Sequence, residues 1–334
     1  MSTNQKILDI ALQATKESIF SSIQEINRLH DELHRQTLSG VDQFLTTQCH
    51  PPAVSFCFLE MGSGGRGERT FWTDQDNAMI YKSDCMENDE IQPFLQQWAE
   101  TAVQRLLAAG YPLCDGWVMA NNPRWLQNIE GWKKQWTEWI RNLTANNIRF
   151  ILLALDMRPV YGSSSLLQEF KEWIGGMDRS AAWIERVVLY SLNYPLPMGV
   201  FGNLLTSRYG DYAGLFHLKE GGYYQMVAII RALSLLAGSQ QASTVDRIAE
   251  LHQKGYFSGE EKKQWEDCLS FYLYARLHQH TACFQNNQPL QDYANLNEWS
   301  SSDLDSLRSH LLFIRKQQKR WRREMAKKKR GGFS

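Results

Sequence analysis

The chain has 334 residues, of which 43% are hydrophobic and 22% charged, with 36 basic and 36 acidic side chains. This length is enough for two compact cores, and the composition is that of a globular protein. The apolar runs fall well short of the roughly 20 residues that cross a membrane. Met1 to Lys6 lead into no apolar stretch typical of a secretory signal. We therefore expect a cytoplasmic protein without a membrane partner.

The zero net charge hides a basic segment near the C-terminus. Between Arg315 and Arg330 there are ten Lys or Arg and one acid, Glu324, which leaves 26 of the 36 basic and 35 of the 36 acidic residues elsewhere. A run of this kind can bind nucleic acid. Because Trp321 is its only aromatic residue, we interpret it as a solvated helix end that continues into a basic tail over 326–334, rather than as a nucleic-acid contact.

The six cysteines form no Cys-x-x-Cys pair and no short Cys/His grid. This spacing argues against a structural zinc site and against a disulfide framework. Reduced thiols are expected at all of them: Cys49, Cys57, Cys85, Cys114, Cys268 and Cys283.

In the first part of the chain, apolar residues at helical spacing predict one long helix or two in tandem over residues 1–47. The apolar run from Val54 to Met61 is typical of a buried strand, and a glycine-rich turn, Gly62 to Gly67, follows it. Alternating polar and apolar residues predict a second strand from Thr73 to Tyr81. A helix is expected over 91–109.

Further along, Asn121-Asn122-Pro123 predicts the start of another helix, whose tryptophans at 125, 132, 136 and 139 share one face. Packing in the core is favoured for them over stacking on a base. Phe150 to Asp156 is apolar until its last residue and predicts a third strand. After Gly162 the periodicity is helical almost throughout.

This order of elements predicts an α/β domain followed by an all-α domain. We place an N-terminal helical segment at 1–49, the α/β domain at 50–165, the helical domain at 166–325 and the basic tail at 326–334.

The residues that point to chemistry lie around the glycine-rich turn. If Asp74 and Asp76 lie in a strand, they share one face, and two carboxylates this close repel each other unless a cation lies between them. Mg²⁺ or Mn²⁺ suits such oxygen ligands. The glycines of 62–67 let backbone N–H groups approach phosphate oxygens, and Ser63, Arg66 and Arg69 add a hydroxyl and positive charge.

Each of these features has an ordinary explanation when taken alone. Glycine-rich turns are common, and an Asp-x-Asp pair often lies on a surface turn. Their conjunction is more specific, because a buried strand, a Gly-Ser turn and then Asp74-Gln75-Asp76 occur within one short stretch. It favours phosphoryl or nucleotidyl transfer.

The stretch Gly62-Ser63 … Asp74-Gln75-Asp76 resembles the nucleotidyltransferases related to DNA polymerase β and kanamycin nucleotidyltransferase. The longer segment MGSGGRGERTFWTDQDNAMIY, from Met61 to Tyr81, resembles a bacterial family of nucleotidyltransferases of unknown function that is related to the N-terminal part of PII-protein uridylyltransferase. The likeness continues through 114–125 and 156–162, and into the helical half at 218–221, 231–233 and 244–247.

The resemblance implies a polymerase-β-like nucleotidyltransferase domain over 50–165 and a substrate-binding helical domain over 166–325. It implies a third catalytic and metal-binding carboxylate, for which Asp156 is the candidate, although Asp156 could instead pair with Arg158. It also places Asn122 near the nucleotide, although an Asn-Asn-Pro turn starts a helix on its own.

In the helical domain the resemblance singles out Lys219, Arg231 and Arg247, which could face the substrate or be solvated. Relatives often carry Glu in place of Gly64 and Gln in place of Arg69. These departures leave the choice of nucleotide base open.

The implied activity is Mg²⁺- or Mn²⁺-dependent transfer of a nucleoside monophosphate from an NTP such as ATP to an acceptor hydroxyl, with release of pyrophosphate. Uridylylation or adenylylation of a signalling protein is the family-level expectation. The alternative is a catalytically degenerate protein that binds nucleotide as a sensor. The acceptor and the oligomeric state stay open.

Overall fold

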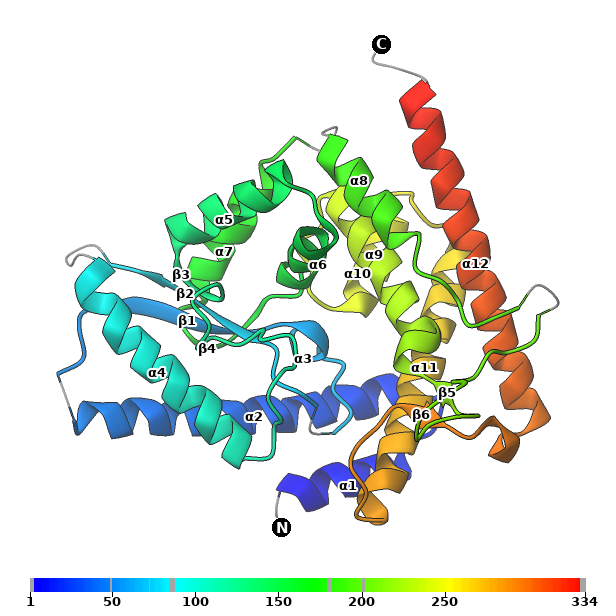
Figure 1. Ribbon diagram of the computed structural model, residues 1–334, viewed down its shortest axis with the longest axis horizontal. Helices are drawn as coiled ribbons and strands as arrows, with labels where there is room; N and C mark the ends of the chain where they lie inside the picture. Colours follow the sequence, from blue (N-terminus) through cyan, green and yellow to red (C-terminus); the bar gives the residue numbers. More distant parts are fainter. Residues whose placement is uncertain are drawn as a thin grey trace. The chain divides into compact units, whose positions relative to one another are not determined.

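The computed structural model describes residues 3–48, 50–71, 73–83, 88–178, 182–199 and 202–330. It divides into two compact units. The first, called here the α/β unit, comprises Met1–Ile10 and Ser21–Met177; the second, the helical unit, comprises Ala11–Phe20 and Asp178–Ser334. Figure 1 shows a small sheet among helices in the first half of the chain and helices in the second. The predicted fold class, an α/β domain with an all-α C-terminal domain, is confirmed.

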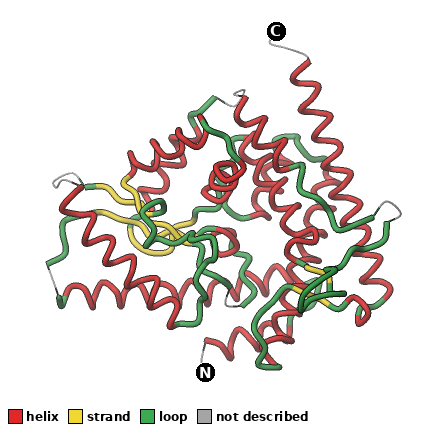
Figure 2. Tube along the Cα trace, in the orientation of Figure 1, coloured by secondary structure: helices red, strands yellow, loops and turns green. Residues whose placement is uncertain are grey.

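The α/β unit is built on a four-stranded sheet with the order β3-β2-β1-β4 (yellow in Figure 2). Strand β1 is antiparallel to both of its neighbours, and β2 and β3 are parallel. The last four residues of β1, from Cys57 to Glu60, are buried, so the central strand leads into the glycine-rich segment from inside the core. The strands are β1 (Ser55–Glu60), β2 (Asn77–Lys82), β3 (Leu126–Asn128) and β4 (Arg158–Gly162).

Helices cover both faces of this sheet. The face that carries Phe56 and Phe58 packs against Trp98 of α4, and α2 lies on the same side (Figure 1). Helices α5 and α7 cover the other face. The helices of this part are α1 (Thr3–Gln13), α2 (Ile19–Thr46), α3 (Gly62–Arg66), α4 (Asn88–Ala108), α5 (Ile129–Arg141), α6 (Ala145–Ala154) and α7 (Ser164–Gly175). Of the two arrangements expected over residues 1–47, the tandem pair is the one observed.

The four tryptophans at 125, 132, 136 and 139 are buried in the core, as predicted. The helix that carries three of them begins later than expected, however. Asn128 caps α5 by accepting a hydrogen bond from Gly131 N at 2.7 Å, and Trp125 precedes β3. The cap at Asn128 prevails over Asn121-Asn122-Pro123 because residues 126–128 are used as a strand.

The third predicted strand, Phe150 to Asp156, is wrong. Most of this run lies in α6, which Thr144 caps by accepting from Asn147 N, and Asp156 lies in the turn before β4. A short, fully apolar run does not distinguish a buried strand from a buried helix. Two smaller differences concern the site: the glycine-rich turn contains the single-turn helix α3, and β2 begins only at Asn77.

The helical unit is organised around α9, whose side chains are buried nearly throughout and which packs against α8 and α10. Its elements are α8 (Ala182–Ser191), β5 (Phe216–His217), the π-helix η1 (Lys219–Tyr223), α9 (Tyr224–Ala237), α10 (Thr244–Gln253), α11 (Gly259–Gln285), β6 (Tyr293–Ala294), the 3₁₀ turn η2 (Leu296–Glu298) and α12 (Ser301–Arg330). Among the described residues, no helix has the length and apolarity needed to cross a membrane.

The cysteines within the described ranges are buried free thiols: Cys57, Cys114, Cys268 and Cys283. Cys49 and Cys85 lie outside those ranges.

Candidate active site

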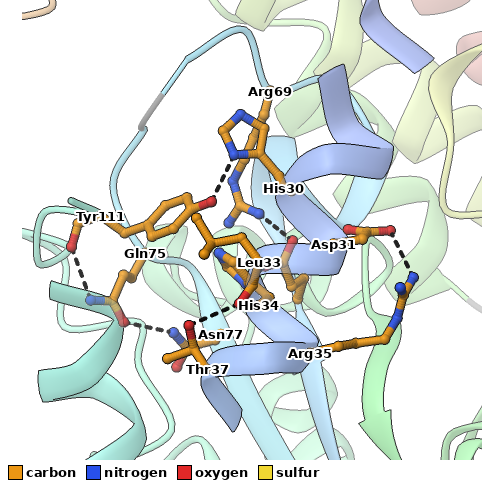
Figure 3. Close-up of polar contacts among 12 residues, drawn as sticks. His30, Asp31, Leu33, His34, Arg35, Thr37, Arg69, Gln75, Asn77 and Tyr111 are labelled. Carbon is orange, nitrogen blue, oxygen red and sulfur yellow. Dashed lines mark hydrogen bonds and ion pairs between the residues drawn. The ribbon is translucent and has the colours of Figure 1, made fainter. Parts of the chain in front are cut away.

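The carboxylates of Asp74 and Asp76 lie side by side, as the sequence predicted. Together with the Cys114 thiol they offer ligand atoms that all lie within 4.8 Å of one another. The reason given for this proximity was wrong, because both residues precede β2. Instead, the side-chain amide of Gln75, between them, is buried and donates to Val103 O at 3.1 Å. It also donates to Tyr111 O at 3.0 Å (Figure 3). With Gln75 anchored inward, the carboxylates on either side of it are left half-buried.

The glycine-rich segment begins directly against this pair. Gly62 has φ = 55°, a left-handed conformation, and a Cβ there would lie 2.2 Å from Asp76 Oδ2. Met61 N also donates to Asp76 O at 2.8 Å. Only glycine fits this position. The first residues of the segment, including Ser63, are therefore fixed beside the carboxylates.

The Cys114 thiol is the neutral neighbour of this carboxylate pair. Its Sγ lies 3.3 Å from Asp76 Oδ1. Burial, and then the nearby Asp76 carboxylate, raise the pKa of this thiol to about 12. At neutral pH the thiol keeps its proton and can donate it to Asp76.

Asp156 is fully buried and forms an ion pair with Arg66. Arg66 Nη1 lies 2.7 Å from Asp156 Oδ2, and Arg66 Nε lies 2.7 Å from Glu68 Oε2. The structure thus brings Asp156 together with Arg66, not with Arg158. It does not bring Asp156 into the ligand group of Asp74 and Asp76 found among the described residues.

Arg69, expected at the phosphates, lies instead in a buried polar cluster. We call Asp31, His34, Glu60, Arg69 and Arg158 the Glu60 cluster; Figure 3 shows the part of it that α2 contributes. Glu60 Oε2 lies 2.5 Å from Arg69 Nη1, and Glu60 Oε1 lies 2.5 Å from His34 Nδ1. Arg158 donates to both carboxylate oxygens of Asp31, at 2.7 and 2.8 Å, and to Gly64 O at 3.0 Å.

The electrostatics of the Glu60 cluster favour the charged carboxylate. Burial alone would raise the pKa of Glu60, but Arg69, His34 and Arg158 outweigh burial and hold that pKa well below its usual value. Arg69 is only 2% exposed. Its charge therefore compensates Glu60 inside the protein and is withheld from a bound phosphate.

Helix α2 also holds the backbone at the end of the glycine-rich segment. The Asn27 carboxamide donates to Arg69 O at 2.9 Å and accepts from Arg69 N at 3.0 Å. One turn on, His30 Nδ1 lies 2.7 Å from the Tyr111 hydroxyl. Burial, with the nearby Arg69 charge, lowers the pKa of His30 well below its usual value, which keeps the ring neutral.

Gly64 and Arg69, two of the positions at which we expected this chain to differ from its relatives, are neighbours. A Cβ on residue 64 would lie 2.3 Å from Glu60 Oε2 and 2.6 Å from Arg69 Cζ. The paired Glu60 and Arg69 side chains therefore occupy the space that a larger residue at position 64 would need.

The other predicted site residues have separate positions. Asn122 holds a turn, because its side chain donates to Trp117 O at 2.9 Å and accepts from Arg124 N at 3.0 Å. In the helical unit Lys219 is exposed, whereas Arg231 and Arg247 are buried. Arg247 Nε donates to Gln241 O at 2.8 Å, which gives it a role within the fold.

Glu60 and the polar face of α2 were not predicted from the sequence. Glu60 carries the only charge in the apolar run Val54 to Met61, a signal that was available. On α2, Asn27, His30 and His34 recur at spacings of three and four on a face otherwise made of aliphatic residues. Buried polar residues at helical spacing imply polar partners across the interface.

Comparison with known families identifies the class of protein. Residues 8–146 match the family described as "Putative nucleotidyltransferase DUF294", and residues 182–325 match its partner, "Putative nucleotidyltransferase substrate binding domain". The chain belongs to this nucleotidyltransferase family, as the sequence resemblance indicated. Asp156 falls between the two matched segments. The comparison with curated proteins finds no relative.

Proposed function

We propose that the protein transfers a nucleoside monophosphate from an NTP to an acceptor hydroxyl. The observation that carries this proposal is the convergence of Asp74 and Asp76 at the start of the glycine-rich segment, in a chain of the nucleotidyltransferase family. In the reaction an acceptor oxygen bonds to the α-phosphorus, the bond from that phosphorus to the pyrophosphate oxygen breaks, and the acceptor proton passes to water.

The donor set fits a divalent cation. Two carboxylates at this separation suit Mg²⁺ or Mn²⁺, which prefer oxygen ligands. Asp74 and Asp76 would hold the ion, which supplies neutralisation of the phosphate charge and activation of the acceptor hydroxyl. Gly62 and Ser63 would lie against the triphosphate, because Gly62 already contacts Asp76.

The proposal assigns the arginines differently from the sequence analysis. Arg66 and Arg69 act by holding the glycine-rich segment in shape, since both are buried in ion pairs. Uridylylation or adenylylation of a protein remains the acceptor chemistry that the family relation suggests.

The second candidate, a nucleotide sensor without turnover, is favoured by one observation. Asp156, the expected third carboxylate, is engaged with Arg66. If catalysis needs three carboxylates at the metal, the ion pair between Asp156 and Arg66 would leave a site that binds the NTP but does not transfer its nucleoside monophosphate. Wild-type protein that binds Mg²⁺–NTP and gives no product with any acceptor pool would support the sensor.

The test is a transfer assay with each α-labelled NTP, Mg²⁺ or Mn²⁺, and a cell lysate as the source of acceptor. Asp74→Asn and Asp76→Asn should lower transfer by roughly 10³-fold, because the charge that holds the cation is halved. Their thermal stability should be unchanged or higher, since one of two crowded carboxylates becomes neutral. Wild-type turnover in either variant would refute the proposal.

Asp156→Asn then separates two roles. As a third ligand, Asp156 would be needed for transfer but not for nucleotide binding or stability. If Asp156 serves instead as the partner of Arg66, the substitution should lower thermal stability, because the buried Arg66 charge loses its compensating carboxylate. Calorimetric titration with a non-hydrolysable NTP, beside thermal unfolding, decides between them.

A further inference from the structure

Trp117 combines two unfavourable features in one residue. Its side chain is 69% exposed, so a large apolar ring lies in water. Its backbone has φ = 54°, a left-handed conformation that is costly for a bulky residue. Asn287 is the only other non-glycine residue with positive φ in the described part of the chain, and asparagine tolerates that conformation far better. Strain of this kind persists where the surroundings impose it, and it clusters at functional sites.

The surroundings that impose this conformation belong to the carboxylate site. Trp117 N donates to Cys114 O at 2.9 Å, which closes a tight turn on the residue that contacts Asp76. The residue after it, Val118, accepts a hydrogen bond from Asn77 N at 3.0 Å. Asn122, which the family resemblance places near the nucleotide, donates to Trp117 O. The turn is thus held on both sides of Trp117: by Cys114, three residues before it, which contacts Asp76, and by Val118, directly after it, which contacts Asn77.

We propose that Trp117 stacks on the base of the NTP. This inference rests on the proposed function, because it takes the triphosphate to lie at Gly62 and Ser63 beside Asp76. The exposed indole lies on the turn whose first residue, Cys114, contacts Asp76. It offers a flat apolar face, and every nucleobase has a matching face. Stacking of this kind contributes affinity with little choice among bases, so ATP and UTP are both accepted.

The proposal predicts that nucleotide affinity and stability respond in opposite directions to one substitution. Trp117→Gly removes the ring and relieves the backbone, because glycine adopts positive φ without cost. Binding of Mg²⁺ with a non-hydrolysable ATP or UTP analogue should weaken about 10- to 100-fold. The midpoint of thermal unfolding should stay the same or rise. Trp117→Phe keeps an aromatic face and should retain affinity within about threefold.

Two matched controls isolate the ring from the backbone. Asn287→Gly makes the same backbone change at φ = 52° in the helical unit. Tyr209→Gly removes another exposed aromatic side chain, 87% exposed, from the same unit. Neither substitution should change nucleotide affinity.

The probes are the ATP and UTP analogues and inorganic tripolyphosphate, each with Mg²⁺, measured by calorimetry. Under the proposal, Trp117→Gly weakens binding of both nucleotides and leaves tripolyphosphate binding unchanged. Equal nucleotide affinity in wild type and Trp117→Gly would overturn the stacking assignment while leaving the proposed function in place. A wild-type protein that binds neither nucleotide nor tripolyphosphate would overturn the proposed function itself, and the stacking assignment with it.

Discussion

The α/β unit contains two groups of acidic residues that differ in what surrounds them. Asp74 and Asp76 are half-buried, and the Cys114 thiol contacts Asp76. Glu60 and Asp156 are buried and each faces an arginine at 2.5 to 2.7 Å. The acids all adjoin strands of one sheet, and arginine side chains supply the counter-charge to the second group.

This difference separates carboxylates that could bind a cation from carboxylates that stabilise the fold. A carboxylate that already has a guanidinium partner stabilises the fold and has little charge left for a cation. Two half-buried carboxylates that lie side by side repel each other, and a cation between them relieves that repulsion. The arginines of the glycine-rich segment follow the same division, since their partners are buried acids rather than phosphates.

The largest effect that we expect to distinguish the two groups of acids is on the stability of the fold. Glu60→Gln should destabilise the α/β unit by about 3–5 kcal/mol, because Arg69 would keep a buried charge without its partner. Asp76→Asn, the same chemical change in the other group, should leave stability unchanged or raise it. Urea unfolding of the two variants measures both effects. Equal destabilisation by the two would erase the distinction between the groups.

A smaller effect is expected from the close approach of Gly64 to Glu60 and Arg69. Gly64→Ala alone should cost about 1–3 kcal/mol, since the added methyl group overlaps the Glu60 carboxylate and the Arg69 guanidinium. In an Arg69→Gln background the same change should cost less, because the shorter side chain frees that space. A double-mutant cycle by urea unfolding gives the coupling. Additive costs would mean that Arg69 is not what restricts position 64.

The Glu60 cluster and its neighbour His30 also predict how stability depends on pH. The lowered pKa of His30 means that the unfolded chain binds a proton below about pH 6.5 that the folded protein refuses. Stability should therefore fall as pH decreases from 6.5, by about 1.4 kcal/mol per pH unit for this group. Below about pH 4.3 the lowered pKa of Glu60 adds a loss of the same sign. His30→Gln should reduce the slope of stability against pH just below pH 6.5. An unchanged slope would mean that other groups cause this pH dependence.

The smallest expected effect concerns Cys114. Cys114→Ala removes the thiol that orients Asp76, at a cost to transfer of less than about tenfold, since a weak neutral hydrogen bond is lost. Cys114→Ser keeps a donor and should restore most of the activity. The measurement is kcat of the two variants. Circular dichroism verifies that both have the same fold. Identical activity of both would show that the thiol does not position the carboxylate.

The sequence predicts the parts of this molecule that depend on local pattern. The helical character of residues 1–47, β1 and the tryptophan core could be predicted from spacing. The proximity of Asp74 to Asp76 was also predicted, but from a strand that begins only after them. The elements that were predicted wrongly depend on competing local signals. Thr144 caps a helix, α6, where the apolar run had predicted a strand, and the cap at Asn128 places the start of α5 later than expected.

The partners of the charged residues could not be predicted in this way. Arg66 meets Asp156 across 90 positions of sequence, and Asn27 meets Arg69 across 42. Such contacts depend on how α2 and the turn before β4 pack against the glycine-rich segment. Spacing within one element carries no information about them, so Arg66 and Arg69 could be identified as important but not given their roles.

The carboxamide of Asn27 pairs with Arg69 as a neighbouring peptide unit would in a sheet, so α2 completes the end of the glycine-rich segment from a distant part of the chain. The helix is consequently not a detachable leader of the α/β unit. A fragment that begins at residue 50 would leave Glu60 without His34 and Arg158 without Asp31, and would expose the backbone of Arg69. Any rearrangement of genes that transplants this nucleotidyltransferase module into another protein must carry α2 with it.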